Sequence, residues 1–266
     1  MMSAQQLNIG LPSGSLKEAT FRLFDKAGYK IHLPLRSYTP EFDDPQLIGL
    51  MFRAQEVAHY VERGVVDVGI TGKDWIVESN ADVEEVAELL YGKSTSRPIR
   101  WVIAVPEESD IRTLKDLQGR RIATELVEGT RRFLRERGIE ADVEFSWGTT
   151  EIKARIPGIA DAIVDLTETG SSLRANRLRI LETMFESTTR LIVNRSVWAD
   201  NRWKREKIES LLTLLAGALE ADSKVGLKMN VPRERLDEVM ENALIPGDAR
   251  TGLVERLGQI VDRLTK

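Results

Sequence analysis

Short apolar runs rich in β-branched residues alternate along this chain with polar loops and amphipathic segments. This alternation constrains the fold more than any other feature, because a repeated order of strand, loop and helix is typical of α/β proteins with largely parallel sheets. The runs that predict strands are Leu7–Leu11, Val65–Ile70, Pro98–Pro106, Arg121–Thr124, Val143–Phe145, Ala162–Leu166 and Thr188–Asn194.

The run Ala162–Leu166 precedes the most informative loop. We expect a buried parallel strand here, with a ligand beyond its carboxyl end, where open α/β sheets place their binding sites. The loop offers hydroxyls, backbone N–H groups and a permissive glycine, and a helix from Leu173 onward would turn its positive end toward an anion. A solvated turn after a strand is the alternative interpretation, and composition leaves both open. The predicted phosphate-binding residues are Thr167, Thr169, Gly170, Ser171 and Ser172.

Two acidic residues lie at the start of this loop. Asp165 and Glu168 are poor partners for a phosphate, but carboxylates suit the two hydroxyls of a ribose or a Mg²⁺ ion that the substrate carries. We therefore predict that both act at the reacting sugar. Mg²⁺ is the expected cofactor, near Asp165, with no site fixed by the protein alone.

The first part of the chain has comparable loops. Ser13 and Gly14 follow the strand Leu7–Leu11 and precede a helix, so the loop predicts either an anion site or a plain helix cap. Arg53 stands where a possible strand ends and an amphipathic helix begins.

The strand Val65–Ile70 ends in another such loop. Lys73 suits a phosphate, whereas Asp74 suits either a ligand or a helix cap, and both interpretations stay open.

Two crossovers, near residues 98–106 and 185–194, would join two α/β lobes around a cleft, and binding sites favour such interfaces. The polar loop Glu125–Gly129 enters a helix and is also expected to face the ligand. The expected divisions are 1–100 with 188–224 as the first lobe, 101–187 as the second lobe, and 225–266 as a small C-terminal region.

Composition excludes several classes of protein. The 266 residues suggest one large or two ordinary domains of roughly 100–200 residues each. The net charge of -4 argues against a general nucleic-acid or membrane-surface binder. The absence of cysteine excludes disulfides and thiolate metal sites. The two histidines, His32 and His59, lie far apart in sequence, which argues against a histidine-rich zinc site. Without a signal peptide or an apolar run of membrane-spanning length, we expect a cytoplasmic protein.

These motifs resemble the ATP phosphoribosyltransferase family over about residues 7 to 247. The most specific piece is Gly158–Asn176, which is similar to the family's phosphoribosyl-pyrophosphate signature. The supporting pieces, in the same order as in the family, are Leu11–Leu16, Arg53 with Glu56, Gly64–Asp74, Arg121–Glu125 and Gly148–Glu151.

The resemblance implies a two-lobed fold like that of type II periplasmic binding proteins. It also implies transfer of a phosphoribosyl group from phosphoribosyl pyrophosphate to N1 of ATP, which releases pyrophosphate in the first step of histidine biosynthesis. The nucleophile belongs to ATP, so the protein supplies positioning and charge stabilisation rather than a nucleophilic side chain. The residues implied around ATP or pyrophosphate are Ser13, Gly14, Arg53, Lys73, Asp74 and Glu151.

The chain departs from the family in two places. Many relatives have a basic residue where this chain has Ser15, so one phosphate contact must come from elsewhere, such as Lys17, or be lost. The long form of the family also has an ACT-like regulatory domain that binds histidine, and residues 227–247 resemble only its beginning. We therefore expect a truncated ACT-like region and weak or absent inhibition by millimolar histidine in a rate assay.

Assembly and two other functions stay open at this stage. The resemblance implies a homo-oligomer, either a dimer or a hexamer, and a regulatory subunit as a further partner. A solute-binding protein would share the lobes but is normally exported, and a noncatalytic sensing relative would keep the binding loops without turnover. Formation of phosphoribosyl-ATP from ATP and phosphoribosyl pyrophosphate separates these alternatives.

Overall fold

The computed structural model describes residues 5–92, 98–222, 224 and 232–235. The chain divides into two compact units, Met1–Ser223 and Lys224–Lys266. The second unit contributes only a short 3-10 turn, η3 (Arg233–Arg235), to the described residues. The expected ACT-like region therefore lies outside the part of the chain that the structure describes.

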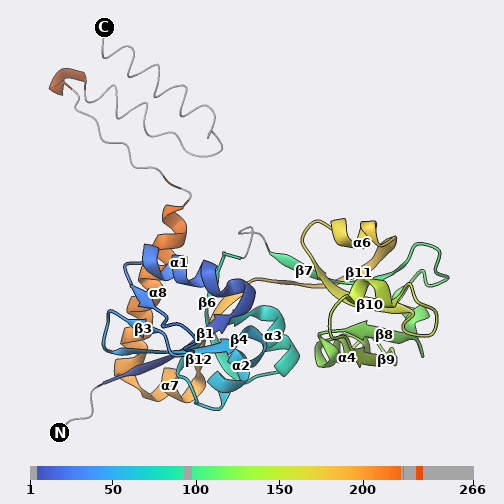
Figure 1. The fold of residues 1–266 in the computed structure, drawn as a ribbon, viewed down its shortest axis with the longest axis horizontal. Coiled ribbons are helices and arrows are strands. Elements are labelled where there is room, and N and C mark those ends of the chain that lie inside the picture. The colour runs from blue at the N-terminus through green and yellow to red at the C-terminus, as the bar shows by residue number, and fades with distance from the viewer. Residues whose placement is uncertain (1–4, 93–97, 223, 225–231, 236–266) are drawn as a thin grey trace. The chain divides into compact units, whose positions relative to one another are not determined.

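The first sheet has seven strands in the order β2-β3-β4-β1-β5-β12-β6 (Figure 1). Strand β1 pairs in parallel with β4 and β5, whereas β12 runs antiparallel to β5 and β6. The carboxyl ends of β1, β4 and β5 therefore meet at one edge. The bounds are β1 Leu7–Ser13, β2 Ile31–His32, β3 Glu41–Phe42, β4 Leu47–Arg53, β5 Val68–Gly72, β6 Val83–Leu89 and β12 Thr189–Asn194.

Helices cover both faces of this sheet. Helices α1 (Lys17–Lys26) and α8 (Arg202–Ala221) pack on one face, and α2 (Ala54–Glu62) and α3 (Lys73–Ser79) pack on the other. Helix α7 (Arg195–Asp200) follows β12. Burial of aliphatic side chains such as those of α2 contributes roughly 1.5–3 kcal/mol each.

Gly69 allows α2 to approach the sheet. A Cβ added at Gly69 would lie 2.5 Å from Val57 and 2.8 Å from Val61, both fully buried on α2. A larger residue on this strand would push the helix away from the edge that carries the candidate site.

The second sheet has five strands in the order β11-β7-β10-β8-β9. Strand β10 confirms the predicted strand, and it runs parallel to β8 but antiparallel to β7. The sheet is thus mixed, because β7 brings the chain in from the first lobe. The bounds are β7 Ile99–Pro106, β8 Arg121–Thr124, β9 Asp142–Phe145, β10 Ala162–Thr167 and β11 Leu178–Ser187.

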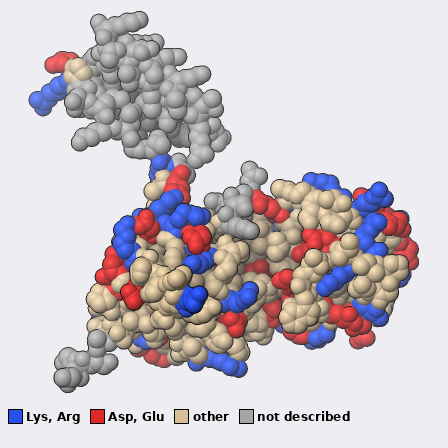
Figure 2. All heavy atoms as spheres, in the orientation of Figure 1, with Lys and Arg blue, Asp and Glu red and all other residues tan. Residues whose placement is uncertain are grey.

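The helices of the second lobe are short. Helix α4 (Val127–Arg135) and the 3-10 helix η2 (Leu114–Leu117) pack on one face, and α5 (Thr150–Lys153) and α6 (Ser171–Ala175) pack on the other. Together with the first sheet they confirm the predicted two-lobed α/β fold. Basic and acidic side chains are interspersed over the visible face of both lobes (Figure 2).

The structure differs from the sequence expectations at two unpredicted strands and at the start of one helix. Strands β6 and β11 were not predicted, because glutamates and other polar residues interrupt their apolar positions. Helix α4 begins at Val127 rather than Thr130, so much of the expected loop 125–129 is helical. Among the described residues, no helix is long and apolar enough to cross a membrane.

Candidate active site

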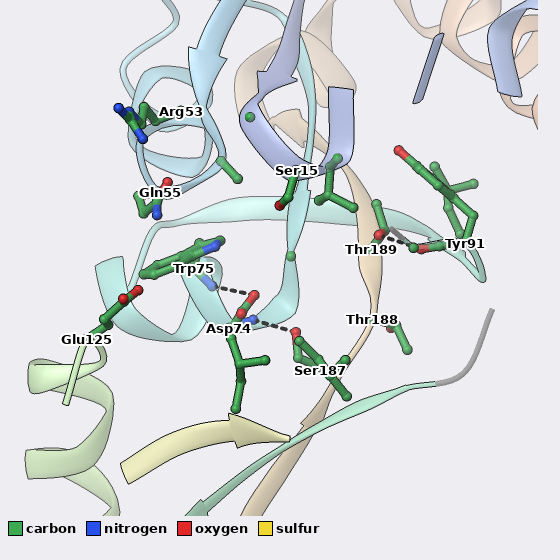
Figure 3. A pocket seen from close by; sticks show the side chains of 18 of the residues that line it. Ser15, Arg53, Gln55, Asp74, Trp75, Tyr91, Glu125, Ser187, Thr188 and Thr189 are labelled. Atoms are coloured by element: carbon green, nitrogen blue, oxygen red, sulfur yellow. Dashed lines mark hydrogen bonds between the residues drawn. The ribbon is translucent and has the colours of Figure 1, made fainter. Parts of the chain in front are cut away.

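A cavity of about 450 Å³ lies between residues of both lobes (Figure 3). Its first wall forms where β1 and β4 end, because Ser13 is the register partner of Arg53 in this parallel pair. Ser13, Gly14 and Arg53 therefore line one cavity although they are 40 residues apart in sequence. The 3-10 helix η1 (Gly14–Leu16) begins at Gly14, whose φ of 83° suits glycine. The Ser13 side chain makes no helix-capping hydrogen bond.

Asp74, in the first turn of α3, also lines the cavity. Its side chain is buried, and Oδ2 accepts a hydrogen bond from Trp101 Nε1 at 3.1 Å. Its Oδ1 accepts one from Trp75 N at 3.1 Å, and its own N–H donates to Ser187 Oγ at 3.1 Å. Burial raises the pKa of the Asp74 carboxyl, and these hydrogen bonds oppose that shift. The N-cap of α3 is Gly72, so Asp74 is not the helix cap that the sequence left open.

Lys73 is directed to a different partner. Its ammonium group pairs with Glu85 on β6, and within the described part of the chain Lys73 does not line the cavity. Lys17, the expected substitute for a basic residue at Ser15, lies 3.5 Å from a Glu18 carboxylate oxygen and over the Phe21 ring. Ser15 itself lines the cavity.

The second lobe supplies the predicted phosphate loop. Thr167 is buried, and its hydroxyl accepts a hydrogen bond from Gly170 N at 2.8 Å. Gly170 has φ 73°, and the Thr169 hydroxyl donates to Ser171 Oγ at 3.0 Å. Ser172 donates to Glu151, which ties the predicted residue Glu151 to this loop. The loop is therefore closed by its own hydroxyls, and Glu168 extends from it to line the cavity.

Carboxylates from both lobes influence one another in this region. Burial raises the pKa of Asp165 to about 6; the nearby charges of Glu151 and Glu125 add to the shift, and the Leu166 N–H opposes it. Burial also raises the pKa of Glu125, with Asp74 adding to the shift and Lys153 opposing it. The carboxylates of Asp74, Glu125 and Asp165 thus form a chain of interacting charges across the lobes.

Several residues that line the cavity were not predicted from the sequence. Glu125 lay in a loop that was expected to face the ligand, but it was not singled out. The position of Trp75, directly after Asp74, was a signal that could have found it. Tyr91 follows β6 and Ser187 is the last residue of β11, and neither strand was predicted. The lining residues that were missed include Gln55, Trp75, Tyr91, Glu125, Leu166, Ser187, Thr188 and Thr189.

Comparison with known proteins places this geometry in one family. Residues 53–217 match the model for HisG, ATP phosphoribosyltransferase. An ATP phosphoribosyltransferase from Prosthecochloris aestuarii is 56% identical over 255 residues, covering 96% of this chain and 85% of that protein. The enzyme of the same name from Thermodesulfovibrio yellowstonii is 58% identical over 239 residues, covering 90% and 81%.

A solved structure agrees with these relatives. The ATP phosphoribosyl transferase (HisG:HisZ) complex from Thermotoga maritima contains a chain that is 29% identical, with a TM-score of 0.69. The match covers 81% of this chain and 99% of that one. The predicted family, two-lobed fold and activity are confirmed by these likenesses, and the chain belongs to the ATP phosphoribosyltransferase family.

Proposed function

We propose that this chain transfers the phosphoribosyl group of phosphoribosyl pyrophosphate to N1 of ATP, giving phosphoribosyl-ATP and pyrophosphate in the first step of histidine biosynthesis. One observation carries the proposal beyond family membership: a single cavity has one wall from the first lobe, with Ser13, Gly14 and Arg53, and one wall from the second, with Glu125, Leu166 and Glu168. A reaction between two large anionic substrates needs two such walls, because each substrate must be held while their reacting atoms meet.

The second lobe binds phosphoribosyl pyrophosphate in this proposal. The 5′-phosphate lies in the loop Thr167–Ser172, where hydroxyls and backbone N–H groups accompany the left-handed Gly170. Asp165 and Glu168 accept hydrogen bonds from the ribose hydroxyls, with Glu151 supporting the loop through Ser172.

The first lobe and Glu125 bind ATP. Ser13, Gly14 and Arg53 face its phosphates, while the Trp75 ring offers a stacking surface for adenine. The Glu125 carboxylate accepts a hydrogen bond from the 6-amino group, which neighbours N1. The bond from N1 to C1′ forms as the bond from C1′ to the pyrophosphate oxygen breaks, and pyrophosphate leaves with the electron pair. A carboxylate at Glu125 then stabilises the positive charge that develops on the purine.

Mg²⁺ stays a proposal for this chain. Among the described residues, no group of three or more His, Asp or Glu side chains is arranged to hold a metal ion. In this proposal the ion arrives on the pyrophosphate, and Asp165 is a neighbouring carboxylate. When bound, the ion neutralises charge on the leaving group.

Assembly and location are proposed at a coarser level. The solved relative is a HisG:HisZ complex, which supports a regulatory subunit as a partner of this chain. A homo-oligomer, a dimer or a hexamer, and a cytoplasmic location stay predictions. Measurement of the mass in solution, with and without histidine, tests the oligomer.

The test of the activity is an absorbance assay of phosphoribosyl-ATP formation with ATP, phosphoribosyl pyrophosphate and Mg²⁺. Time-dependent product formation that needs all three supports the proposal. Binding of both substrates by calorimetry without product would instead identify a noncatalytic relative.

A further inference from the structure

Helices α3 and α4, which belong to different lobes, are joined by hydrogen bonds from one charged side chain of each helix. Glu78 of α3 accepts two hydrogen bonds from α4, one from Glu128 N at 3.0 Å and one from Gly129 N at 2.8 Å. In the other direction, Arg132 of α4 donates to the carbonyl oxygens of Val77 and Glu78.

Each of these charged side chains contacts a helix end that carries the opposite partial charge. The first N–H groups of a helix and its last carbonyl groups have no partner within the helix, and they carry partial positive and negative charge, respectively. The carboxylate of Glu78 occupies the N-terminal end of α4, and the guanidinium of Arg132 occupies the C-terminal end of α3. The contacts are charge-assisted, and they join residues 50 or more positions apart rather than stabilising one helix.

Gly129 allows the two helices to approach this closely. A Cβ added at Gly129 would lie 3.3 Å from Glu78 Oε2 and 3.4 Å from Val77 Cγ1. Both distances are tight, so even alanine would require the carboxylate to shift.

Both helices also carry walls of the cavity. The N–H groups of Lys73 and Asp74 at the start of α3 donate to Thr188 and Ser187, on the returning crossover, and Trp75 follows directly. Glu125 precedes α4. Its neighbours Thr124 and Leu126 are both buried, and Leu126 N donates a hydrogen bond to Thr124 Oγ1 at 3.0 Å, which fixes the backbone on both sides of Glu125. A change in the spacing of the two helices would therefore change the spacing of Trp75 and Glu125.

We propose that Glu78 and Arg132 are positioning residues that form an interlobe clamp, which holds Trp75 and Glu125 at the spacing needed to bind ATP between them. This inference rests on the proposed function for the identity of the ligand. The clamp operates in the free enzyme, so the cavity is formed before substrate arrives.

Loss of the clamp should affect binding more than chemistry. If only a fraction of the free enzyme has the lobes in the binding arrangement, the apparent KM rises by the inverse of that fraction. We expect the E78Q and R132M variants to raise the KM for ATP on the order of tenfold, with kcat within about twofold of wild type, because bound substrate restores the arrangement. Damage to the fold would instead lower the active fraction and kcat.

The two lobes can be monitored directly because the chain has no cysteine. Cysteines introduced at the exposed positions Glu209 on α8 and Glu136 after α4 carry spin labels. Pulsed electron paramagnetic resonance then gives the distance between the two labels without substrate. We expect a longer or broader distance distribution for E78Q, for R132M and for the double variant, with the double variant little different from either single one. The matched controls are E140Q and R135M, both at exposed positions, which should keep the wild-type distance and KM.

Unchanged distances and KM values in both E78Q and R132M would overturn the clamp. Circular dichroism and thermal unfolding identify a variant that does not fold, and R132M tests the same clamp if E78Q fails. The distance measurement needs no turnover, so a wild-type enzyme that made no phosphoribosyl-ATP would contradict the proposed function and leave the clamp to be judged by distance.

Discussion

The two walls of the cavity are built in different ways. In the second lobe, Glu168 reaches the cavity from the loop Thr167–Ser172, which is closed by its own hydrogen bonds, such as that from Gly170 N to Thr167 Oγ1. In the first lobe, the wall is assembled from the separate ends of β1, β4 and β5, at Ser13, Arg53 and Gly72. A contiguous loop carries its own geometry, whereas a composite wall depends on the register of a whole sheet.

This difference predicts different consequences of substitution. Changes in the Thr167–Ser172 loop should act locally and mainly on phosphoribosyl pyrophosphate. Changes in the first-lobe wall should act mainly on ATP, because its groups converge only in the folded sheet. If substitutions in either wall changed the KM values for both substrates equally, this division between the walls would be contradicted.

Substitution of Asp165 should have the largest effect. In the proposed function, D165A removes a carboxylate that contacts the ribose, and we expect kcat to fall on the order of 10²–10³-fold, as for other groups that stabilise charge at a reacting centre. The fold should survive, so the circular dichroism spectrum of D165A should match that of wild type. The control D200A removes an exposed aspartate on α7 and should keep wild-type turnover. A D165A rate close to that of wild type would remove Asp165 from the site.

The same residue should cost the protein stability at neutral pH. Burial is the main reason that the pKa of Asp165 rises from 3.8 to about 6 in the folded chain. The folded state therefore binds more protons than the unfolded state between these values, so stability falls as pH rises through this window, and the whole cost is present above it. D165N removes the charge and should raise the free energy of unfolding at about pH 7.5 by up to about 2–3 kcal/mol, at about 1.4 kcal/mol per pKa unit. Urea unfolding at about pH 7.5 and pH 4 checks this, because the difference should shrink to about 0.5 kcal/mol at the lower pH, which is close to the unfolded pKa of 3.8.

Arg53 tests the composite wall. Its side chain lines the cavity, and a charged hydrogen bond to phosphate contributes roughly 1.5–3 kcal/mol. We expect R53M to raise the KM for ATP at least about tenfold, with a smaller change for phosphoribosyl pyrophosphate. R63M, at the other end of α2, changes an exposed arginine in the same way and should leave both KM values unchanged. An equal effect of R53M on both substrates would mean that the walls do not divide the substrates as proposed.

Gly170 tests the contiguous loop. Its φ of 73° lies in the left-handed region, where a side chain costs roughly 1–2 kcal/mol. The added Cβ would lie 3.0 Å from Arg174 Nη1, which is the flexible end of a side chain, so backbone strain is the main cost. We expect G170A to raise the KM for phosphoribosyl pyrophosphate about fivefold to tenfold and to leave that for ATP nearly unchanged. The control is G217A in α8, where the added Cβ meets no described atom within 4 Å.

The contrast between the walls also explains what could be predicted from sequence. The strand Ala162–Leu166 and its loop form one continuous motif, so the sequence alone indicated both the element and its residues. The strand that ends near Asp74 was equally visible, and the structure buries that aspartate beside the cavity. Two-lobed folding followed from the order of such units along the chain.

Residues that meet only through tertiary structure could not be predicted in this way. Lys73 pairs with Glu85 because β6 joins the sheet beside β12, and the alternating charges of β6 hid that strand. Trp101, on the first crossover strand β7, donates a hydrogen bond to Asp74 at the start of α3. Neither contact leaves a local signal, since each depends on which strands become neighbours.

Ser15 provides the smallest and most specific test of the first-lobe wall. It is exposed and lines the cavity, whereas the ammonium of Lys17 lies near Glu18 and Phe21. Because an exposed charge contributes only about 0.2–1 kcal/mol, S15K should lower the KM for ATP about twofold to fivefold at low salt, and added salt should screen much of the gain. The control S210K adds the same charge at an exposed position on α8 and should leave the KM unchanged. If S15K instead improved binding of phosphoribosyl pyrophosphate alone, the first-lobe wall would face that substrate, and the assignment of the two walls would have to be exchanged.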